Sequence, residues 1–224
     1  MKILYLAHRV PYPPNKGDKI RTFNEIRYLS QNHDIDLLTL TENPDDLQYR
    51  KNLEKYCNRV RIYALNTLKS KLNSMAGLVL SSSPLSVFYF YSKELLFCLD
   101  QWMAKTVYDA VICFSSPMAE YLFRCSSLKK KLRPARPVPK NLEPVLIMDF
   151  CDVDSRKWHQ YAANSRFPMS LIYGIESRRL FKYEKMINRL FHHSVFVSNH
   201  EVDVFRKMNT DRKSTRLNSS HVSQ

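Results

Sequence analysis

Short apolar runs alternate with amphipathic segments along most of the chain. Six runs have the length and composition of buried strands, at residues 3–7, 35–40, 60–65, 110–114, 145–148 and 194–197. Helical spacing of apolar positions is found in a first helix that carries Ile20, Phe23, Ile26 and Leu29, and helices are also expected at 118–123, 170–191 and 199–207, with a polar helix at 45–56. Uninterrupted apolar strands that alternate with helices are typical of a parallel sheet covered on both faces. The pattern predicts one α/β domain with a doubly wound, mainly parallel sheet.

Two segments interrupt this alternation. Residues 71–99 combine apolar and aromatic side chains and are bordered by Lys69, Lys71 and Lys93. We expect a pair of core helices under the sheet there, with an interfacial contact to a membrane as the alternative. Residues 129–144 are rich in Lys, Arg and Pro, which is typical of an exposed basic loop.

The chain is strongly basic. Its 224 residues carry a formal charge of +14 and are 44% hydrophobic, so they can bury the core of one large domain or two small ones. An excess of positive charge suits nucleic acid, an anionic membrane face or phosphorylated small molecules. The basic and aromatic side chains are not interleaved on a recognisable nucleic-acid module, so no nucleic-acid partner is expected.

Cysteine usage and hydropathy bear on the compartment. The five cysteines are scattered, lie mostly in apolar runs and form no CxxC pair, which is typical of buried, reduced thiols in a cytosolic protein. The apolar run before His8 is short and has no cleavage site behind it, and no stretch reaches the roughly 18 apolar residues of a membrane span. We expect a cytoplasmic protein, with peripheral contact at the inner membrane face as an option.

The loop after the first strand is the first candidate site. Prolines stiffen it, and Gly17 at its end allows the backbone to turn or to approach a ligand where a Cβ would obstruct. Asp18 is placed to cap the helix that follows. The free N–H groups of that helix lie among Lys16, Lys19 and Arg21 and suit an anion such as a sugar phosphate. A tight turn with solvated lysines is the alternative.

Polar side chains also follow the first and the fourth strand directly. His8, with Arg9 beside it, lies where the first strand meets the loop, and it either contacts a substrate or fills space. Ser115 and Ser116 follow the fourth strand and either donate hydrogen bonds to a substrate or cap a helix. No G-x-S-x-G pattern surrounds the two serines, so a nucleophile elbow is not expected.

The densest polar cluster, MDFCDVDSRKWHQY at residues 148–161, follows the fifth strand. Loops at the carboxyl ends of parallel strands form the ligand crevice of open α/β sheets, so this cluster and the first loop should face the same region. Asp152 and Asp154 suit a divalent metal that carries a nucleotide-sugar diphosphate, whereas the Asp-x-Asp-Ser opening also suits a helix cap. Lys157 and Trp158 are candidates for substrate contact.

Several stretches together are similar to a known family. The segments HRVPYPPNKGDKIRTFNEIRYLS, DAVICFSSPMAEYL and LIMDFCDVDSRKWHQYA resemble the sugar transferases associated with the PEP-CTERM/exosortase system, members of glycosyltransferase family four. The segment FHHSVFVSNHEVDVFRK resembles the last strand and helix of that family's N-terminal domain, and the resemblance covers residues 1–208 in register. It implies a GT-B enzyme with two Rossmann-like domains, of which the N-terminal one binds mainly the acceptor and the C-terminal one mainly the nucleotide-sugar.

The resemblance also implies a retaining reaction that usually needs no bound metal and no cofactor besides the nucleotide-sugar as co-substrate. Residues 16–19 would border the donor phosphates and the acceptor, and residues 152–158 would line the acceptor side of the cleft. The family's second domain, with its paired glutamates and nucleotide pocket, is missing from this sequence. Residues 211–224, DRKSTRLNSSHVSQ, resemble read-through of a sequencing-adapter oligonucleotide. We therefore take residues 1–210 as the domain and expect this fragment to be inactive by itself.

The expected function is transfer of a sugar from a nucleotide-sugar to an exopolysaccharide or lipid-linked acceptor. Asp152 and Asp154 are the catalytic candidates in this part, and the main catalytic residues are expected in the missing domain. The candidates for substrate binding are His8, Arg9, Lys16, Gly17, Asp18, Lys19, Arg21, Ser115, Ser116, Lys157 and Trp158. Two other classes stay open: a single-domain, metal-dependent transferase that uses Asp152 and Asp154, and a non-catalytic module that binds anionic lipid or polysaccharide.

Overall fold

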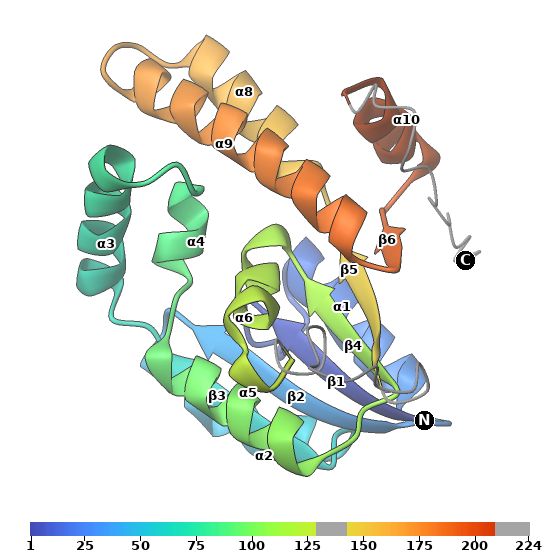
Figure 1. The fold of residues 1–224 in the computed structure, drawn as a ribbon. Coiled ribbons are helices and arrows are strands. Elements are labelled where there is room, and N and C mark those ends of the chain that lie inside the picture. Colours follow the sequence, from blue (N-terminus) through green and yellow to red (C-terminus); the bar gives the residue numbers. More distant parts are fainter. Residues whose placement is uncertain (129–142, 209–224) are drawn as a thin grey trace.

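The computed structural model describes residues 1–128 and 143–208. In these residues six strands form one sheet in the order β3-β2-β1-β4-β5-β6, and every neighbouring pair is parallel (Figure 1). The strands are β1 Lys2–Ala7, β2 Asp34–Thr41, β3 Arg59–Ala64, β4 Ala110–Phe114, β5 Val145–Asp149 and β6 His193–Val195. The expected α/β class and the doubly wound, parallel sheet are confirmed.

Helices fill most of the connections between strands. They are α1 Gly17–Leu29, α2 Arg50–Leu53, α3 Thr67–Leu80, α4 Leu85–Tyr89, α5 Lys93–Lys105, α6 Ala119–Arg124, α8 Asp154–Asn164, α9 Met169–Leu190 and α10 Asn199–Met208, with 3-10 segments η1 Pro44–Tyr49 and η2 Ser116–Met118. The expectation of one helix over residues 45–56 is wrong. Asn43 and Pro44 start a 3-10 segment without buried residues, and only one turn of α-helix follows it. The polar sequence there has no apolar face that would hold a longer helix against the sheet.

Alternate residues of the central strand β1 pack against the two layers of helices. Leu4 and Leu6 lie in a buried cluster with side chains of α5, α6 and α9, whereas Tyr5 and Ala7 lie in a second cluster with α1 and α2. Successive side chains of a strand point to opposite faces, so both faces of the sheet are covered. Figure 1 shows α5 and α6 on the near face and α1 on the far face.

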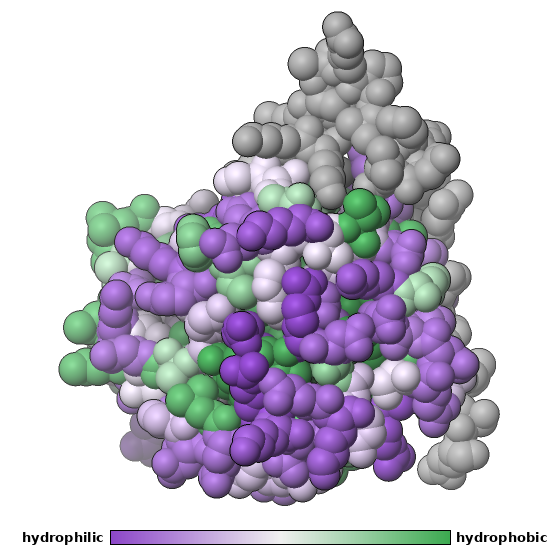
Figure 2. All heavy atoms as spheres, turned by 90° about the horizontal axis from the view of Figure 1, so that it is seen from below, coloured by the Kyte–Doolittle hydropathy of each residue, from purple (hydrophilic) through white to green (hydrophobic). Residues whose placement is uncertain are grey.

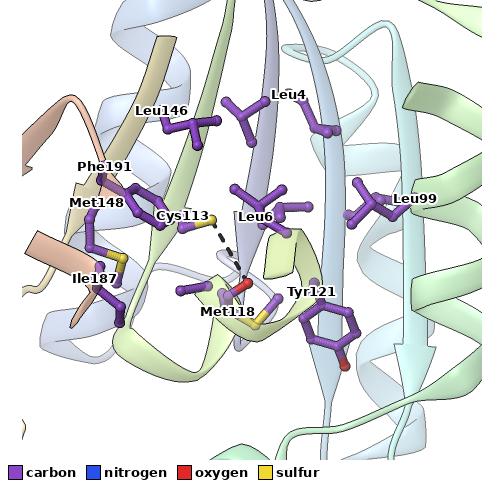
Figure 3. Close-up of a cluster of buried hydrophobic side chains, with 14 of the residues drawn as sticks. Leu4, Leu6, Leu99, Cys113, Met118, Tyr121, Leu146, Met148, Ile187 and Phe191 are labelled. Carbon is purple, nitrogen blue, oxygen red and sulfur yellow. Dashed lines mark hydrogen bonds between the residues drawn. The ribbon is translucent and has the colours of Figure 1, made fainter. Parts of the chain in front are cut away.

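The larger cluster is built around the middle of the sheet (Figure 3). Leu6 and Met148 meet Met118 of η2 and Ile187 of α9 there. The thiol of Cys113 lies 3.8 Å from the carbonyl oxygen of Met118, and burial raises its pKa. All five cysteines are free and four are buried, as their scattered, apolar setting predicts.

The carboxyl ends of the central strands are level with one another. Ala7 pairs in register with Phe114, and Phe114 pairs with Asp149. The strand order reverses between β1 and β4, and open α/β sheets bind ligands in the crevice at such a switch point. His8 and Ser115, each the first residue after its strand, therefore start from the same edge of the sheet.

The segment that interrupts the alternation is only partly a core element. Val87 of α4 and Leu99 of α5 are buried in the larger cluster. Helix α3, in contrast, buries Ser70 and Gly77 and exposes most of its large apolar side chains. The expectation of a core helical pair is therefore wrong for α3, because the face of α3 that is turned inward carries small and polar residues.

Two expectations fall on residues that the structure does not describe. They are most of the basic loop at 129–144 and the tail at 211–224. The sheet and the helices that cover it lie within residues 1–128 and 143–208. Among the helices of these two ranges, none is both long and apolar enough to cross a bilayer.

Candidate functional site

His8 is the first residue after β1 and lies in an aromatic enclosure. Its ring is stacked on Phe114, with centroids 6.0 Å apart, and it meets Phe90 edge-on at 5.4 Å. Its Nε2 lies 3.7 Å from Oδ2 of Asp18, and its Nδ1 is buried without a hydrogen-bond partner among the described residues. Burial, together with the charge of Arg9, lowers the pKa of His8 to about 4. The imidazole is therefore neutral at pH 7.

Helix α1 begins differently from the expectation. Lys16 is the N-cap residue and makes no side-chain cap, while Asp18 lies in the first turn, where its Oδ1 accepts the backbone N–H of Lys19 at 2.9 Å. The expectation that Asp18 is the cap residue is thus wrong, although its charge still stabilises the start of the helix. Gly17 has no positive φ, and an added Cβ would meet no atom within 4 Å. The protein itself therefore leaves open space beside Gly17.

Two of the cations expected to bind substrate, Arg9 and Lys19, are paired with carboxylates. Arg9 lies 3.0 Å from Asp18 and 3.5 Å from Glu42, and Nζ of Lys19 lies 3.5 Å from Asp46. The side chain of Lys19 is only 12% exposed, so it points toward η1 and not into the crevice. Lys16 is exposed. A role of these cations in phosphate binding stays a prediction. The exposed ammonium group of Lys16 is better placed for this role than the paired side chains of Arg9 and Lys19.

An ion pair ties the first helix to the fifth strand. Arg21 donates to Oδ2 of Asp149 from Nε at 3.0 Å and from Nη2 at 2.7 Å, and its Nε lies 3.1 Å from Glu25. Asp149 is almost fully buried, and its other oxygen accepts the N–H of Cys151 at 2.8 Å. Burial and the charge of Asp149 raise the pKa of Glu25 to about 8, and the hydroxyl of Tyr5 donates to Glu25 at 2.6 Å. The helix that follows the proline loop and the start of the acidic segment thus meet at one edge of the sheet.

A second cluster joins η2 to the start of α8. Ser116 is buried, and its hydroxyl donates to Oδ2 of Asp154 at 3.4 Å. Burial raises the pKa of Asp154 to about 7, although the charge of Lys157 opposes the shift. The charge of Lys157 also lowers the pKa of His8. Ser116 and Asp154 are thus in direct contact, and Lys157 lies within electrostatic range of Asp154 and of His8.

The chain is locally strained where it leaves β4 and β5. Ser115 has φ 77° and Cys151 has φ 60°, in the left-handed region that non-glycine residues rarely adopt. The expectation that Ser115 and Ser116 cap a helix by their side chains is wrong, because η2 has no such cap and the hydroxyl of Ser116 is turned to Asp154. The same holds for the Asp-x-Asp-Ser opening, since α8 begins at Asp154 without a side-chain cap.

Asp152 and Trp158 differ in their surroundings from Asp154. Asp152 is exposed and lines a small hollow together with Lys157 and other side chains of α8 and α10. The ring of Trp158 lies 5.8 Å from that of Tyr161 and 5.2 Å from that of Tyr173, within the hairpin of α8 and α9. The structure thus places Trp158 in helix packing and separates the two aspartates by environment.

Glu184 of α9 is a site residue that the sequence reasoning missed. It is fully buried, accepts the N–H of Ser155 at 3.0 Å and also accepts the hydroxyl of Ser155. Burial and the charge of Asp154 raise the pKa of Glu184 to about 8. Glu184 holds the first turn of α8 and so positions Asp154. Its signal in the sequence is a carboxylate on the face of α9 that carries Leu180 and Glu176 toward the interior.

Since no similar protein was found, the chemistry of the candidate site is the basis for a functional proposal. Comparison of the chain with family models, with curated proteins and with solved structures gave no match. Among residues 1–128 and 143–208, no three His, Cys, Asp or Glu side chains are grouped to hold a metal ion. Residues near the carboxyl ends of the central strands provide a neutral imidazole, a carboxyl group that titrates near pH 7 and the exposed ammonium groups of Lys16 and Lys157. Such a set can bind an anionic, hydroxyl-bearing ligand and hold one proton.

Proposed function

We propose that this chain is the acceptor-side domain of a two-domain glycosyltransferase, which moves a sugar from a nucleotide-sugar to an exopolysaccharide or lipid-linked acceptor. The observation that carries the proposal is the hydrogen bond from Ser116, which follows β4, to Asp154, which follows β5, at the edge of the sheet where His8 leaves β1. The motifs that resemble glycosyltransferase family four cover the same residues. A cytoplasmic setting, where nucleotide-sugars are available, belongs to the same proposal.

Asp154 is the group that receives the acceptor hydroxyl. Its carboxyl, with a pKa of about 7, accepts a hydrogen bond from the hydroxyl and can take up its proton as the new bond forms. The hydroxyl of Ser116 and the buried carboxyl of Glu184 behind α8 hold Asp154 in one orientation. Neutral His8, at the end of β1, adds no charge that would bind the departing diphosphate too tightly.

The departing nucleoside diphosphate needs positive charge and backbone donors as its charge develops. The exposed ammonium group of Lys16, at the start of α1, and the open space beside Gly17 suit that end of the reaction. Lys157 suits a second phosphate from the other side of the crevice. The nucleotide itself is assigned to the second domain, as the resemblance implies.

The test uses the full-length enzyme, with its second domain, in an assay of transfer from nucleotide-sugars to a lipid-linked or polysaccharide acceptor. Asp154→Asn should lower kcat by about a hundredfold or more, the usual range for a lost general base. The matched control Asp152→Asn, at an exposed carboxylate, should change kcat by less than about threefold. Unchanged turnover in Asp154→Asn would contradict the assigned role.

Two further outcomes decide between the classes of function. Equal losses in Asp152→Asn and Asp154→Asn, with activity that EDTA abolishes and Mn²⁺ restores, would replace the proposal by a metal-dependent transferase. The 224-residue chain alone should transfer no sugar. Transfer by this chain without a second domain would contradict the two-domain account.

A further inference from the structure

Helix α3 presents its large apolar side chains to solvent. Leu68, Leu72, Met75 and Val79 are 68%, 58%, 68% and 83% exposed. Their spacing of four, three and four residues aligns them along one side of the helix, and we call this set the α3 stripe. The buried residues of α3 are instead Ser70 and Gly77, on the opposite side. The apolar side of α3 therefore faces solvent, and the side with small residues faces the protein.

The contacts on the inward side fix this orientation. Gly77 packs directly on the ring of Phe88 in α4, since an added Cβ would lie 2.4 Å from Cδ2 of that ring. Arg179 of α9 donates to the carbonyl oxygen of Gly77 at 3.0 Å and to that of Leu78 at 2.8 Å. A large apolar residue cannot replace Gly77 in this contact, so the stripe cannot rotate inward. It is a fixed surface of the folded domain.

The surroundings of the stripe are positively charged. Lys69 and Lys71 are exposed and flank the stripe on either side, because they lie about 100° and 60° around the helix from it. The sequence holds no acidic residue between Glu54 and Glu94, a span that contains all of α3 and α4. Apolar residues flanked by lysines, with no carboxylate among them, are complementary to an anionic surface that has an apolar layer beneath it.

The positive charge continues at the far end of the stripe. Val79 and Leu80 border a hollow of about 1680 Å³, whose wall from α9 carries the exposed side chains of Arg178 and Lys182. The hollow is also lined by two carboxylates, Glu143 and Glu120, of which Glu120 pairs with an arginine of its own helix at 2.6 Å. Exposed cations therefore accompany the stripe at both ends.

We infer that the α3 stripe docks this protein on a lipid bilayer rich in anionic phospholipids. The stripe enters the boundary between headgroups and acyl chains, and Lys69 and Lys71 lie against the phosphates. In the view from below, Figure 2 shows apolar side chains that protrude at the left edge, on the side where Figure 1 places α3. This docking surface goes beyond the proposed sugar transfer and does not depend on it.

The test is flotation of the 224-residue chain with vesicles of phosphatidylcholine alone or mixed with phosphatidylglycerol. We expect binding to the mixed vesicles and little binding to phosphatidylcholine alone. The double variant Leu72→Glu/Met75→Glu should lower the bound fraction by more than about tenfold, because two apolar anchors are replaced by charges that the anionic surface repels. Both side chains are exposed, so the unfolding midpoint should not change.

A matched control separates the stripe from exposed apolar residues in general. Tyr28 on α1 is 72% exposed and lies on the opposite face of the sheet, so Tyr28→Glu should bind vesicles as the unchanged protein does. The double variant Lys69→Ser/Lys71→Ser should bind the mixed vesicles about tenfold more weakly and lose most of the remaining salt dependence. This pattern would support docking by the stripe.

Three results would overturn the inference. The first is failure of the unchanged protein to bind the mixed vesicles, and the second is equal binding by Leu72→Glu/Met75→Glu. The third is a dimer in light scattering that this double variant converts to a monomer, which would assign the stripe to a second copy of the chain. No sugar substrate enters these measurements, so their failure is distinct from failure of the proposed function.

Discussion

Arg21 in the first turns of α1 and Asp149 at the end of β5 form a two-bond ion pair, although 128 positions separate them. Both bonds end on Oδ2 of Asp149, at 3.0 and 2.7 Å. The pair neutralises a carboxylate that is 2% exposed, and it joins helix α1 to the end of strand β5, next to the candidate site. The fold of the site and the charge balance of the core therefore depend on the same contact.

Loss of this pair should cost stability. Arg21→Leu leaves Asp149 buried without its partner, and we expect the free energy of unfolding to fall by about 3–5 kcal/mol in urea denaturation. Arg27→Leu, at an exposed arginine of the same helix, is the control and should change it by less than about 0.5 kcal/mol. The double variant Arg21→Leu/Asp149→Leu should be more stable than Arg21→Leu, because no charge is left unpaired. A double variant that is no better than the single one would refute this account.

Asp154 should make stability depend on pH between about pH 4 and pH 7. Its pKa rises from about 3.8 in the unfolded chain to about 7 in the fold, so the fold favours the protonated form. This contribution is present below pH 4 and is lost as the pH rises through 7. The free energy of unfolding of Asp154→Asn, relative to that of the unchanged protein, should therefore rise by about 1–2 kcal/mol as the pH increases from 5 to 8. Parallel unfolding curves of the two proteins over this range would contradict the prediction.

His8 should make stability fall as the pH is lowered, which is the opposite of the effect of Asp154. Its pKa falls from about 6.5 in the unfolded chain to about 4 in the fold, so the fold favours the neutral imidazole. The contribution is complete above pH 6.5 and is lost as the pH falls toward 4. His8→Asn should remove about 2–3 kcal/mol of the acid-induced loss of stability between pH 7 and pH 4. The exposed His159 provides a control, since His159→Asn should keep the full acid sensitivity.

Two glycines in helices should respond in opposite ways to the same substitution. A Cβ at Gly77 would lie 2.4 Å from the ring of Phe88, so Gly77→Ala should destabilise the domain by about 1–3 kcal/mol. A Cβ at Gly174 within α9 would meet nothing within 4 Å, so Gly174→Ala should stabilise it by about 0.5–1 kcal/mol. Thermal unfolding of the two variants measures both signs. A stabilising Gly77→Ala would show that the contact between α3 and α4 is looser than described.

Helix ends were harder to predict than strands. An apolar run such as residues 3–7 reports burial on two faces of a sheet, which is a local property of the sequence. A helix cap forms only if the capping side chain has no better hydrogen-bond or ion-pair partner. At this site such partners come from distant parts of the chain. Asp18 is contacted by Arg9, and the hydroxyl of Ser116 is turned to Asp154. The expected caps at these positions fail because longer-range partners compete for the same atoms.

The amino-acid sequence by itself determined the class of fold, since period and length of the apolar runs are enough to specify buried parallel strands between helices. It also determined which polar residues follow the strands. Only the tertiary structure decided that Arg21 is bound to Asp149, that Asp154 titrates near neutrality, and that the stripe of α3 faces outward. Helical spacing places apolar residues on one side of a helix but does not say which side meets the protein. Ion pairs and pKa values likewise depend on groups that are distant in the chain and adjacent only after folding.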